Sequence, residues 1–170
     1  MSQRDEKKAQ FQRQKKVGLF PLVAASLVVL AAVGILGWKA VGSGGGKVRT
    51  VVADNGTVAI PTAQVSDGKA HFFSYEKGGA RIDFFVLKSH DGVIRAAFDA
   101  CDVCFKARKG YRQEGDVMVC NNCNQQFRSD LINEVKGGCN PAPLKRSVAD
   151  GRIIIAATDL AGGARYFQGQ

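Results

Sequence analysis

The sequence has 170 residues, which is enough for one domain of ordinary size with additional segments attached to it. Its formal net charge of +9 gathers near the amino terminus, where residues 1–16 contain six Lys or Arg and two acidic residues. We interpret this basic tail as a determinant of membrane topology, so we expect no nucleic-acid partner. No histidine stands beside a candidate nucleophile and no carboxylate pair recurs in a motif, so nothing indicates a hydrolase.

Residues 17–38 form an uncharged apolar segment of 22 residues, VGLFPLVAASLVVLAAVGILGW. At about 1.5 Å per residue, a helix of this length spans the roughly 30 Å hydrocarbon core, so we predict one transmembrane helix in contact with lipid. A cleavable signal peptide is the alternative, but its apolar region would be only about 7–15 residues long. The positive charge before the span predicts a cytoplasmic tail at residues 1–16. The protein is then a single-pass protein of a bacterial inner (cell) membrane, with its carboxy-terminal domain periplasmic or extracellular.

Residues 39–47 include the run Ser43-Gly44-Gly45-Gly46, which is typical of a flexible linker. Residues 48–170 then form one cysteine-rich domain. Turn signals such as Asp54-Asn55-Gly56 and Lys77-Gly78-Gly79 separate short β-type runs in its first half.

The pattern predicts a β-rich α+β domain built on a small antiparallel sheet. Strands are expected at residues 48–52, 57–60, 71–75, 81–87, 93–98 and 152–157. The third to fifth of these form an antiparallel meander that leads to Cys101, and the last closes the sheet. One or two helical turns are expected at residues 129–135, and Asp159 is expected to cap a short final helix. Five aromatic residues at strand spacing are expected in the core: Phe72, Phe73, Phe84, Phe85 and Phe98.

All five cysteines fall between residues 101 and 139, and four of them form two CxxC pairs, Cys101/Cys104 and Cys120/Cys123. Fifteen residues separate the two pairs, a spacing typical of a four-thiolate metal site. A two-residue gap lets one tight turn direct both sulfurs at one point, and a second such turn can face the first. The four thiolates can hold zinc or another single metal ion, or an iron–sulfur cluster.

Three other roles for these cysteines stay open. Zinc could serve only to fold a ribbon-like interaction module, the thiols could carry out thiol–disulfide exchange, or the site could handle copper. Disulfides are a further alternative, because an exported domain lies in an oxidising compartment. Cys139 follows the second pair by another fifteen residues and is a candidate fifth ligand, an exchanging thiol or a simple buried cysteine. These roles point to metal binding or electron transfer rather than catalysis, and an enzymatic activity stays open.

Several motifs of this chain together resemble the FtrD-like family of membrane iron–sulfur proteins, and the resemblance extends over residues 48–167. The motifs are Phe98-Asp99-Ala100-Cys101-Asp102-Val103-Cys104-Phe105, Gly110-Tyr111-Arg112-Gln113-Glu114-Gly115, Met118-Val119-Cys120-Asn121-Asn122-Cys123, Gly137-Gly138-Cys139-Asn140-Pro141-Ala142-Pro143-Leu144, and upstream Ile60-Pro61 and Val65-Ser66-Asp67-Gly68-Lys69-Ala70-His71-Phe72.

The resemblance implies a role in bacterial ferrous-iron uptake, in which the FtrD-like member passes electrons between an iron oxidase or permease and the membrane. The implied partners are other membrane iron-uptake or redox proteins. The implied cofactor is an iron–sulfur cluster, of the 4Fe-4S kind, held by Cys101, Cys104, Cys120 and Cys123. Cys139 also matches the family but has no implied role. Some relatives carry several membrane spans, whereas this chain has one.

Overall fold

The computed structural model describes residues 48–168. The basic tail, the expected transmembrane helix at residues 17–38 and the linker at residues 39–47 therefore lie outside the described residues. Within residues 48–168 no helix is both long and apolar enough to span a bilayer. The described part of the chain is the cysteine-rich domain.

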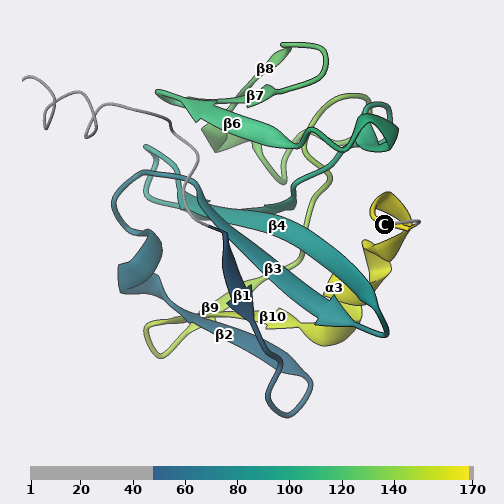
Figure 1. Cartoon of the computed structure of the whole chain (residues 1–170). Helices are drawn as coiled ribbons and strands as arrows, with labels where there is room; N and C mark the ends of the chain where they lie inside the picture. Colours follow the sequence, from purple (N-terminus) through teal and green to yellow (C-terminus); the bar gives the residue numbers. More distant parts are fainter. Residues whose placement is uncertain (1–47, 169–170) are drawn as a thin grey trace, which may run out of the picture. The chain divides into compact units, whose positions relative to one another are not determined.

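The largest sheet has four strands in the order β1-β3-β4-β5 (Figure 1). Its strands are β1 (Arg49–Val51), β3 (His71–Lys77), β4 (Ala80–Lys88) and β5 (Ile94–Phe98). Strands β3, β4 and β5 pair antiparallel in succession, which confirms the predicted meander. Strand β1 pairs parallel with β3, a departure from the purely antiparallel sheet that we expected.

A second sheet has the order β2-β10-β9 and lies below the first in Figure 1. It consists of β2 (Thr57–Pro61), β10 (Arg152–Ala156) and β9 (Ser147–Ala149), paired antiparallel. The final strand is therefore correctly predicted, but the expectation that it closes the first sheet is wrong. It pairs with β2 instead, since Ile153 and Ile155 alternate toward the core that β2 also covers.

The main core lies between these two sheets. Strand β4 supplies Ile82, Phe84 and Val86 to it, and the intervening residues Phe85 and Leu87 point to the opposite face. This alternation follows from the two-residue period of a strand. Four of the five predicted core aromatics are buried and Phe72 is partly buried, so β4 is covered on both faces.

The opposite face of β4 carries a third sheet with the order β6-β7-β8 (Figure 1, top). Its strands are β6 (Tyr111–Glu114), β7 (Val117–Cys120) and β8 (Gln126–Arg128), and we did not predict them. A smaller core joins this sheet to Phe85 and Leu87 and includes both Cys101 and Cys120. The domain is therefore a three-layer β structure in which the third layer carries the second CxxC pair.

Helical structure is sparse in the described residues. The expected turns at residues 129–135 reduce to one 3₁₀ turn, η3 (Ser129–Leu131). The helix α3 (Ala157–Gly162) begins after Ala156, and Asp159 lies within its first turn rather than at the cap. The predicted cap is therefore wrong, because the chain enters the helix directly from β10 with no side-chain capping bond.

Candidate metal centre

The structure brings the sulfurs of all five cysteines into one region between the first and third sheets. The sulfurs of Cys101, Cys104 and Cys139 lie within 4.8 Å of one another. Those of Cys104, Cys120 and Cys123 form a second group within the same limit. Cys104 is common to both groups, and its Sγ lies 3.7 Å from that of Cys139.

The first CxxC turn follows the end of β5. Strand β5 is fully buried near its end, and residue Cys101 comes three positions after Phe98. The backbone N–H of Cys104 donates to the Cys101 sulfur at 3.1 Å, which closes the turn. The 3₁₀ turn η2 (Phe105–Ala107) then carries the chain away from the sulfurs.

The second CxxC turn lies at the end of β7 and is shaped in the same way. The backbone N–H groups of Cys123 and Asn122 donate to the sulfur of Cys120, and the N–H of Gln125 donates to that of Cys123. Asn124 has a φ of +58°, a left-handed conformation that Asn tolerates better than most residues, and its N–H donates to Cys120 O at 2.9 Å. Hydrogen bonds from backbone N–H groups stabilise a thiolate that is bound to a metal, and both turns direct such donors at a cysteine sulfur.

Cys139 is held in place by backbone contacts rather than by a CxxC turn. The hydroxyl of Tyr111 donates to Cys139 O at 2.6 Å. Three residues further on, Ala142 N donates to Ala100 O at 2.9 Å and Phe98 N donates to Ala142 O at 2.8 Å. The Cys139 segment therefore runs along the free edge of β5, beside the strand that delivers Cys101.

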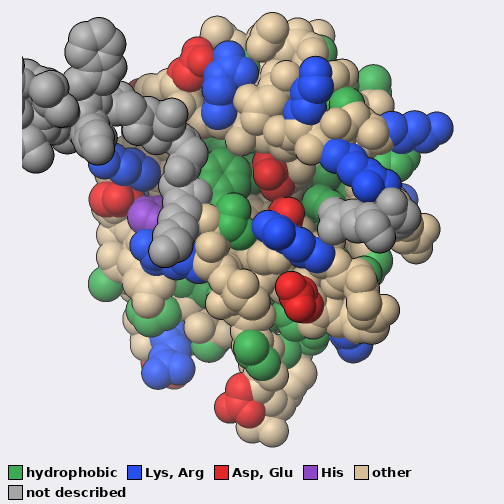
Figure 2. Space-filling view, in the orientation of Figure 1, with side chains coloured by type: hydrophobic (Ala, Val, Ile, Leu, Met, Phe, Trp, Pro, Cys, Tyr) green, Lys and Arg blue, Asp and Glu red, His purple; other side chains and the backbone are tan. Residues whose placement is uncertain are grey.

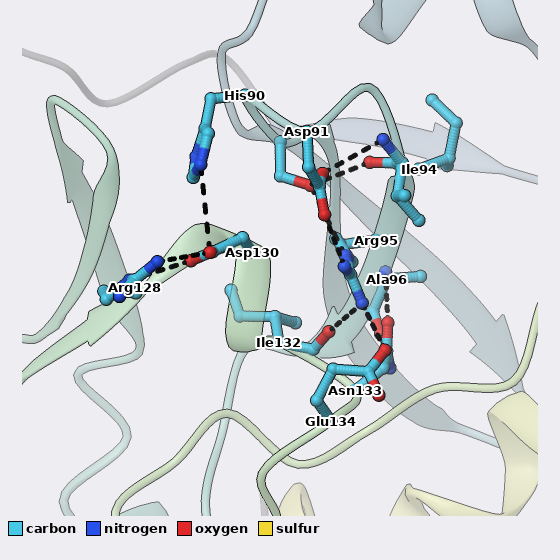
Figure 3. A network of polar contacts seen from close by, with 12 residues as sticks. His90, Asp91, Ile94, Arg95, Ala96, Arg128, Asp130, Ile132, Asn133 and Glu134 are labelled. Carbon is cyan, nitrogen blue, oxygen red and sulfur yellow. Dashed lines mark hydrogen bonds and ion pairs between the residues drawn. The ribbon is translucent and has the colours of Figure 1, made fainter.

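A buried arginine ties the start of the same segment to β5 (Figure 3). Arg95 is 5% exposed and donates to Asp91 Oδ2 at 2.8 Å, to Ile132 O at 3.2 Å and to Glu134. Asn133 completes the connection by accepting from Ala96 N and donating to Ala96 O. These contacts fix the path by which the chain returns from the third sheet toward Cys139.

The five thiols differ in exposure and acidity. Burial raises the pKa of the Cys120 thiol to about 11. Loss of solvent, and then the neighbouring Cys104 and Cys123 sulfurs, raise the pKa of Cys139 to about 12. Cys123 is exposed, and the N–H of Gln125 lowers the pKa of its thiol. The Cys123 thiol therefore ionises more readily than those of Cys120 and Cys139.

A hollow of about 100 Å³, partly open to solvent, lies beside the sulfurs. Three cysteines, Cys101, Cys104 and Cys120, contribute to its wall. Asp99 also lines it, accepts from Tyr111 N at 2.7 Å through Oδ1, and has its pKa raised to about 7 by burial. The other polar and aromatic residues of the wall include Asp83, Arg108, Lys109, Tyr111 and Tyr166.

The loop between the two CxxC pairs contains four basic residues, namely Lys106, Arg108, Lys109 and Arg112. Arg112 donates to Asn121 Oδ1 at 3.0 Å, beside the second turn, and Arg108 donates to Gln168 O. Figure 2 shows one face of the molecule, on which Lys and Arg side chains are spread out with some acidic and hydrophobic side chains between them. Such cations reduce the electrostatic cost of gathering thiolates.

The donor set fits a thiophilic metal. Bonds of about 2.3 Å to zinc in a tetrahedral site place neighbouring sulfurs about 3.8 Å apart, and the Cys104 and Cys139 sulfurs are separated by 3.7 Å. The four CxxC cysteines that we predicted as ligands all lie in this region, and the cysteine groups can hold a metal. We did not predict a role for Asn122, whose Nδ2 donates to Cys104 Sγ at 3.4 Å, although its place inside the second CxxC pair was a usable signal.

The fold and the site together define a small layered β domain with a cluster of cysteines that can hold a metal. Residues 65–167 match the family described as "Membrane iron-sulfur containing protein FtrD-like". The chain belongs to this family, as the sequence motifs indicated, and the family is described as a membrane one.

Among solved structures, the chain is similar to the quaternary ammonium Rieske monooxygenase CntA in complex with inhibitor MMV12, at 15% identity and a TM-score of 0.39. That alignment covers 65% of this chain and 32% of the monooxygenase. CntA with γ-butyrobetaine gives 15% identity, a TM-score of 0.38 and coverage of 64% and 32%. This chain thus spans about a third of the length of those proteins, and no curated protein sequence matches it.

Proposed function

We propose that this protein is a membrane-anchored metal or iron–sulfur protein that transfers electrons or handles metal during bacterial iron uptake. The observation that carries the proposal is the convergence of the cysteine sulfurs on one region, with backbone N–H groups directed at them. A disulfide-stapled domain has no need of N–H donors aimed at sulfur. Membership in the FtrD-like family of membrane iron-sulfur containing proteins supports iron–sulfur chemistry in particular.

The ligands in this proposal are Cys101, Cys104, Cys120 and Cys123. An iron–sulfur cluster bound there would supply one-electron redox chemistry at a potential set by hydrogen bonds and exposure. The protein contributes the N–H donors at Cys101 and Cys120, which stabilise the more negative reduced state. Cys123 is exposed, so it gives a short route from the centre to the surface for an electron or a metal ion.

In the same proposal residues 17–38 anchor the domain in the cell membrane, with the domain on the outer side. Its partners are other membrane iron-uptake or redox proteins. The cations of residues 106–112 offer such a partner an electropositive face beside the centre.

A structural zinc module is the second candidate. It is favoured by the place of Cys101 and Cys120 inside the smaller core, where a metal would hold the third sheet to β4. In that case the metal would fold the protein and undergo no redox change.

One experiment separates these functions. The full chain is purified in detergent without air, and its iron, sulfide and zinc content is measured together with its visible spectrum. We expect iron and sulfide with visible absorption that bleaches on reduction. A colourless protein with stoichiometric zinc would support the structural module and contradict electron transfer, and a metal-free protein would contradict both.

A further inference from the structure

The five sulfurs do not surround a single point evenly. They form two groups of three that share only Cys104. Cys101 and Cys139 complete one group, and Cys120 and Cys123 complete the other, while the Cys123 sulfur also contacts that of Cys139. The cysteines of the two groups come from different parts of the fold. Cys101 follows β5 and Cys139 precedes the segment that bonds to the edge of β5, whereas Cys120 ends β7 of the third sheet and Cys123 follows it.

One tetrahedral ion bound to the four CxxC cysteines would require all four sulfurs to lie about 3.8 Å from one another. Among the described residues, the four CxxC sulfurs do not form one such group, because Cys101 falls in the other set from Cys120 and Cys123. The separation of 3.7 Å between the Cys104 and Cys139 sulfurs instead suits two ligands of the same ion. Cys139 therefore has the geometry of a ligand.

We propose that the centre has two metal positions that share the Cys104 sulfur as a bridging ligand. Cys101 and Cys139 complete the first position, and Cys120 and Cys123 complete the second. The ligands that they would take are two divalent, thiophilic first-row metal ions. The inference rests on the proposed function only in that the cysteines bind metal. It replaces one centre on the four CxxC cysteines with two ions and makes Cys139 a ligand.

The surroundings of Cys104 suit a shared sulfur. It lies between the groups, is only partly exposed, and receives a further hydrogen bond from Asn122 Nδ2 at 3.4 Å. The backbone N–H of Cys104 donates to the Cys101 sulfur, so this residue contacts a second ligand of the first group as well as supplying its own sulfur. A thiolate has several lone pairs, so binding two ions costs it no other contact.

Charge favours two ions over one. When all five cysteines bind as thiolates, a single divalent ion would leave three net negative charges in a region where Cys101 and Cys120 are each only 1% exposed. Two divalent ions leave one net negative charge. Buried charge is costly unless it is compensated, so the second ion stabilises the full thiolate set.

Three sulfurs per ion leave one position of a four-coordinate ion for a non-protein ligand. The hollow beside the centre is lined by Cys101, Cys104 and Cys120, so it touches both groups. A small ligand can therefore reach either ion from the same side. This arrangement differs from a closed four-thiolate site, which has no open position.

The test is an anaerobic titration of the reduced, metal-free full chain in detergent with Co²⁺, followed by visible absorption and electron paramagnetic resonance. We expect binding to saturate at two ions per chain. Cobalt ions that share a sulfur couple magnetically, so we also expect the resonance intensity per cobalt to fall as the second equivalent binds. Saturation at one ion per chain overturns the inference while leaving the proposed metal function intact, and absence of binding overturns both.

Reciprocal variants identify the two positions. Cys139→Ser should bind one Co²⁺ with the spectrum of the Cys120 and Cys123 position, and Cys123→Ser should bind one with that of the other position. Both should lose the magnetic coupling, and Cys104→Ser should lose it together with tight binding of both ions. Circular dichroism checks that each variant is folded. If folded Cys139→Ser still binds two coupled ions, the fifth ligand is refuted.

Discussion

The two hydrophobic cores of this domain differ in size and in residue composition. The core between the first two sheets contains nineteen buried residues, nearly all aliphatic or aromatic, whereas the core under the third sheet contains eight, two of which are cysteines. Apolar burial stabilises by about 25 cal/mol per Å², so the larger core can hold its sheets without help. We expect the smaller core to need a bound metal to hold the third sheet. We therefore expect folding to depend on the larger core and metal binding to depend on the layer added on β4.

Metal removal should produce the largest effect and separates the two regions directly. Structural thiolate metal sites contribute about 10–16 kcal/mol in small peptides, far more than the smaller core can supply. We expect residues 111–128 to lose protection from hydrogen exchange after chelation under reducing conditions, while β3, β4 and β5 stay protected. Mass spectrometry of peptic fragments measures both, and readdition of metal serves as the control. Equal loss of protection in all three sheets would contradict the comparison.

Truncation of one ring in each core should give the next largest difference. Phe84 is fully buried in the larger core, so Phe84→Ala should reduce the free energy of unfolding by about 3–5 kcal/mol. Phe127 is only partly buried against Tyr111, and its sheet is expected to open without metal, so Phe127→Ala should cost less than about 1 kcal/mol in the metal-free chain. Urea unfolding of both metal-free variants measures this. A Phe127 effect as large as that of Phe84 would show that the third sheet is stable without metal.

Substitution of two glycines tests whether the contact between Gly110 and Asp99 fixes the wall of the hollow. Gly110 has a φ of +61°, and a Cβ atom there would lie 2.3 Å from Oδ2 of Asp99, the residue whose carboxylate accepts from Tyr111 N. Gly115 has a φ of +57° with nothing within 4 Å of such an atom, so Gly115→Ala is the matched control. Left-handed strain costs each variant about 1–2 kcal/mol.

Gly110→Ala should cost about 1–3 kcal/mol more than the control, because Asp99 must leave its hydrogen bond. It should also weaken Co²⁺ binding, which Gly115→Ala should leave unchanged. Thermal unfolding and cobalt titration of both variants provide the comparison. Equal effects would mean that the Asp99 side chain can move away at little cost and that its hydrogen bond does not fix the turn before β6.

The smallest predicted effect concerns acid and the link between the two regions. Hydrogen bonds from Ser89, from Val93 N and from Arg95 hold the pKa of Asp91 below its ordinary value near 3.8. A carboxyl group with a lowered folded-state pKa stabilises the fold above its unfolded value, and this contribution disappears as the pH falls through the folded one. Stability should therefore decline below about pH 4, less steeply in Asp91→Asn than in the parent chain.

The exposed Glu76→Gln is the control for that measurement and should keep the slope of the parent. Urea unfolding of the metal-free chain between about pH 5 and pH 2 gives the slope in each case. An unchanged slope in Asp91→Asn would show that the bonds from Ser89, Val93 and Arg95 to Asp91 do not depend on its charge.

The sequence predicted the meander and the two CxxC turns because both depend on local rules. Alternating apolar residues set the strands β3 to β5, and a two-residue gap sets the turn between paired cysteines. The third sheet was missed because its strands are three or four residues long and give little periodicity. The partner of β10 was missed because the alternation of Ile153 and Ile155 predicts that one face of the strand is buried but does not predict which strand pairs with it.

The position of Cys139 could not be read from spacing, since it depends on contacts between distant parts of the chain. Its segment is fixed by Ala142 on the edge of β5 and by the hydroxyl of Tyr111. A sequence pattern shows that a cysteine exists at residue 139 but not which edge of a sheet its loop follows. The sequence named Cys139 as a candidate fifth ligand, and the structure places its sulfur 3.7 Å from that of Cys104.

The edge of β5 also sets an order of assembly. Residues 142–144 bond to Ala96, Phe98 and Ala100, so the meander must exist before that segment has a surface on which to settle. Cys139 is also the last of the five cysteines to be synthesised, after both CxxC turns. The first two sheets thus provide the surface on which the Cys139 segment docks. Metal captured earlier would be held by an incomplete set of ligands, and release would become slow only once the edge segment has docked.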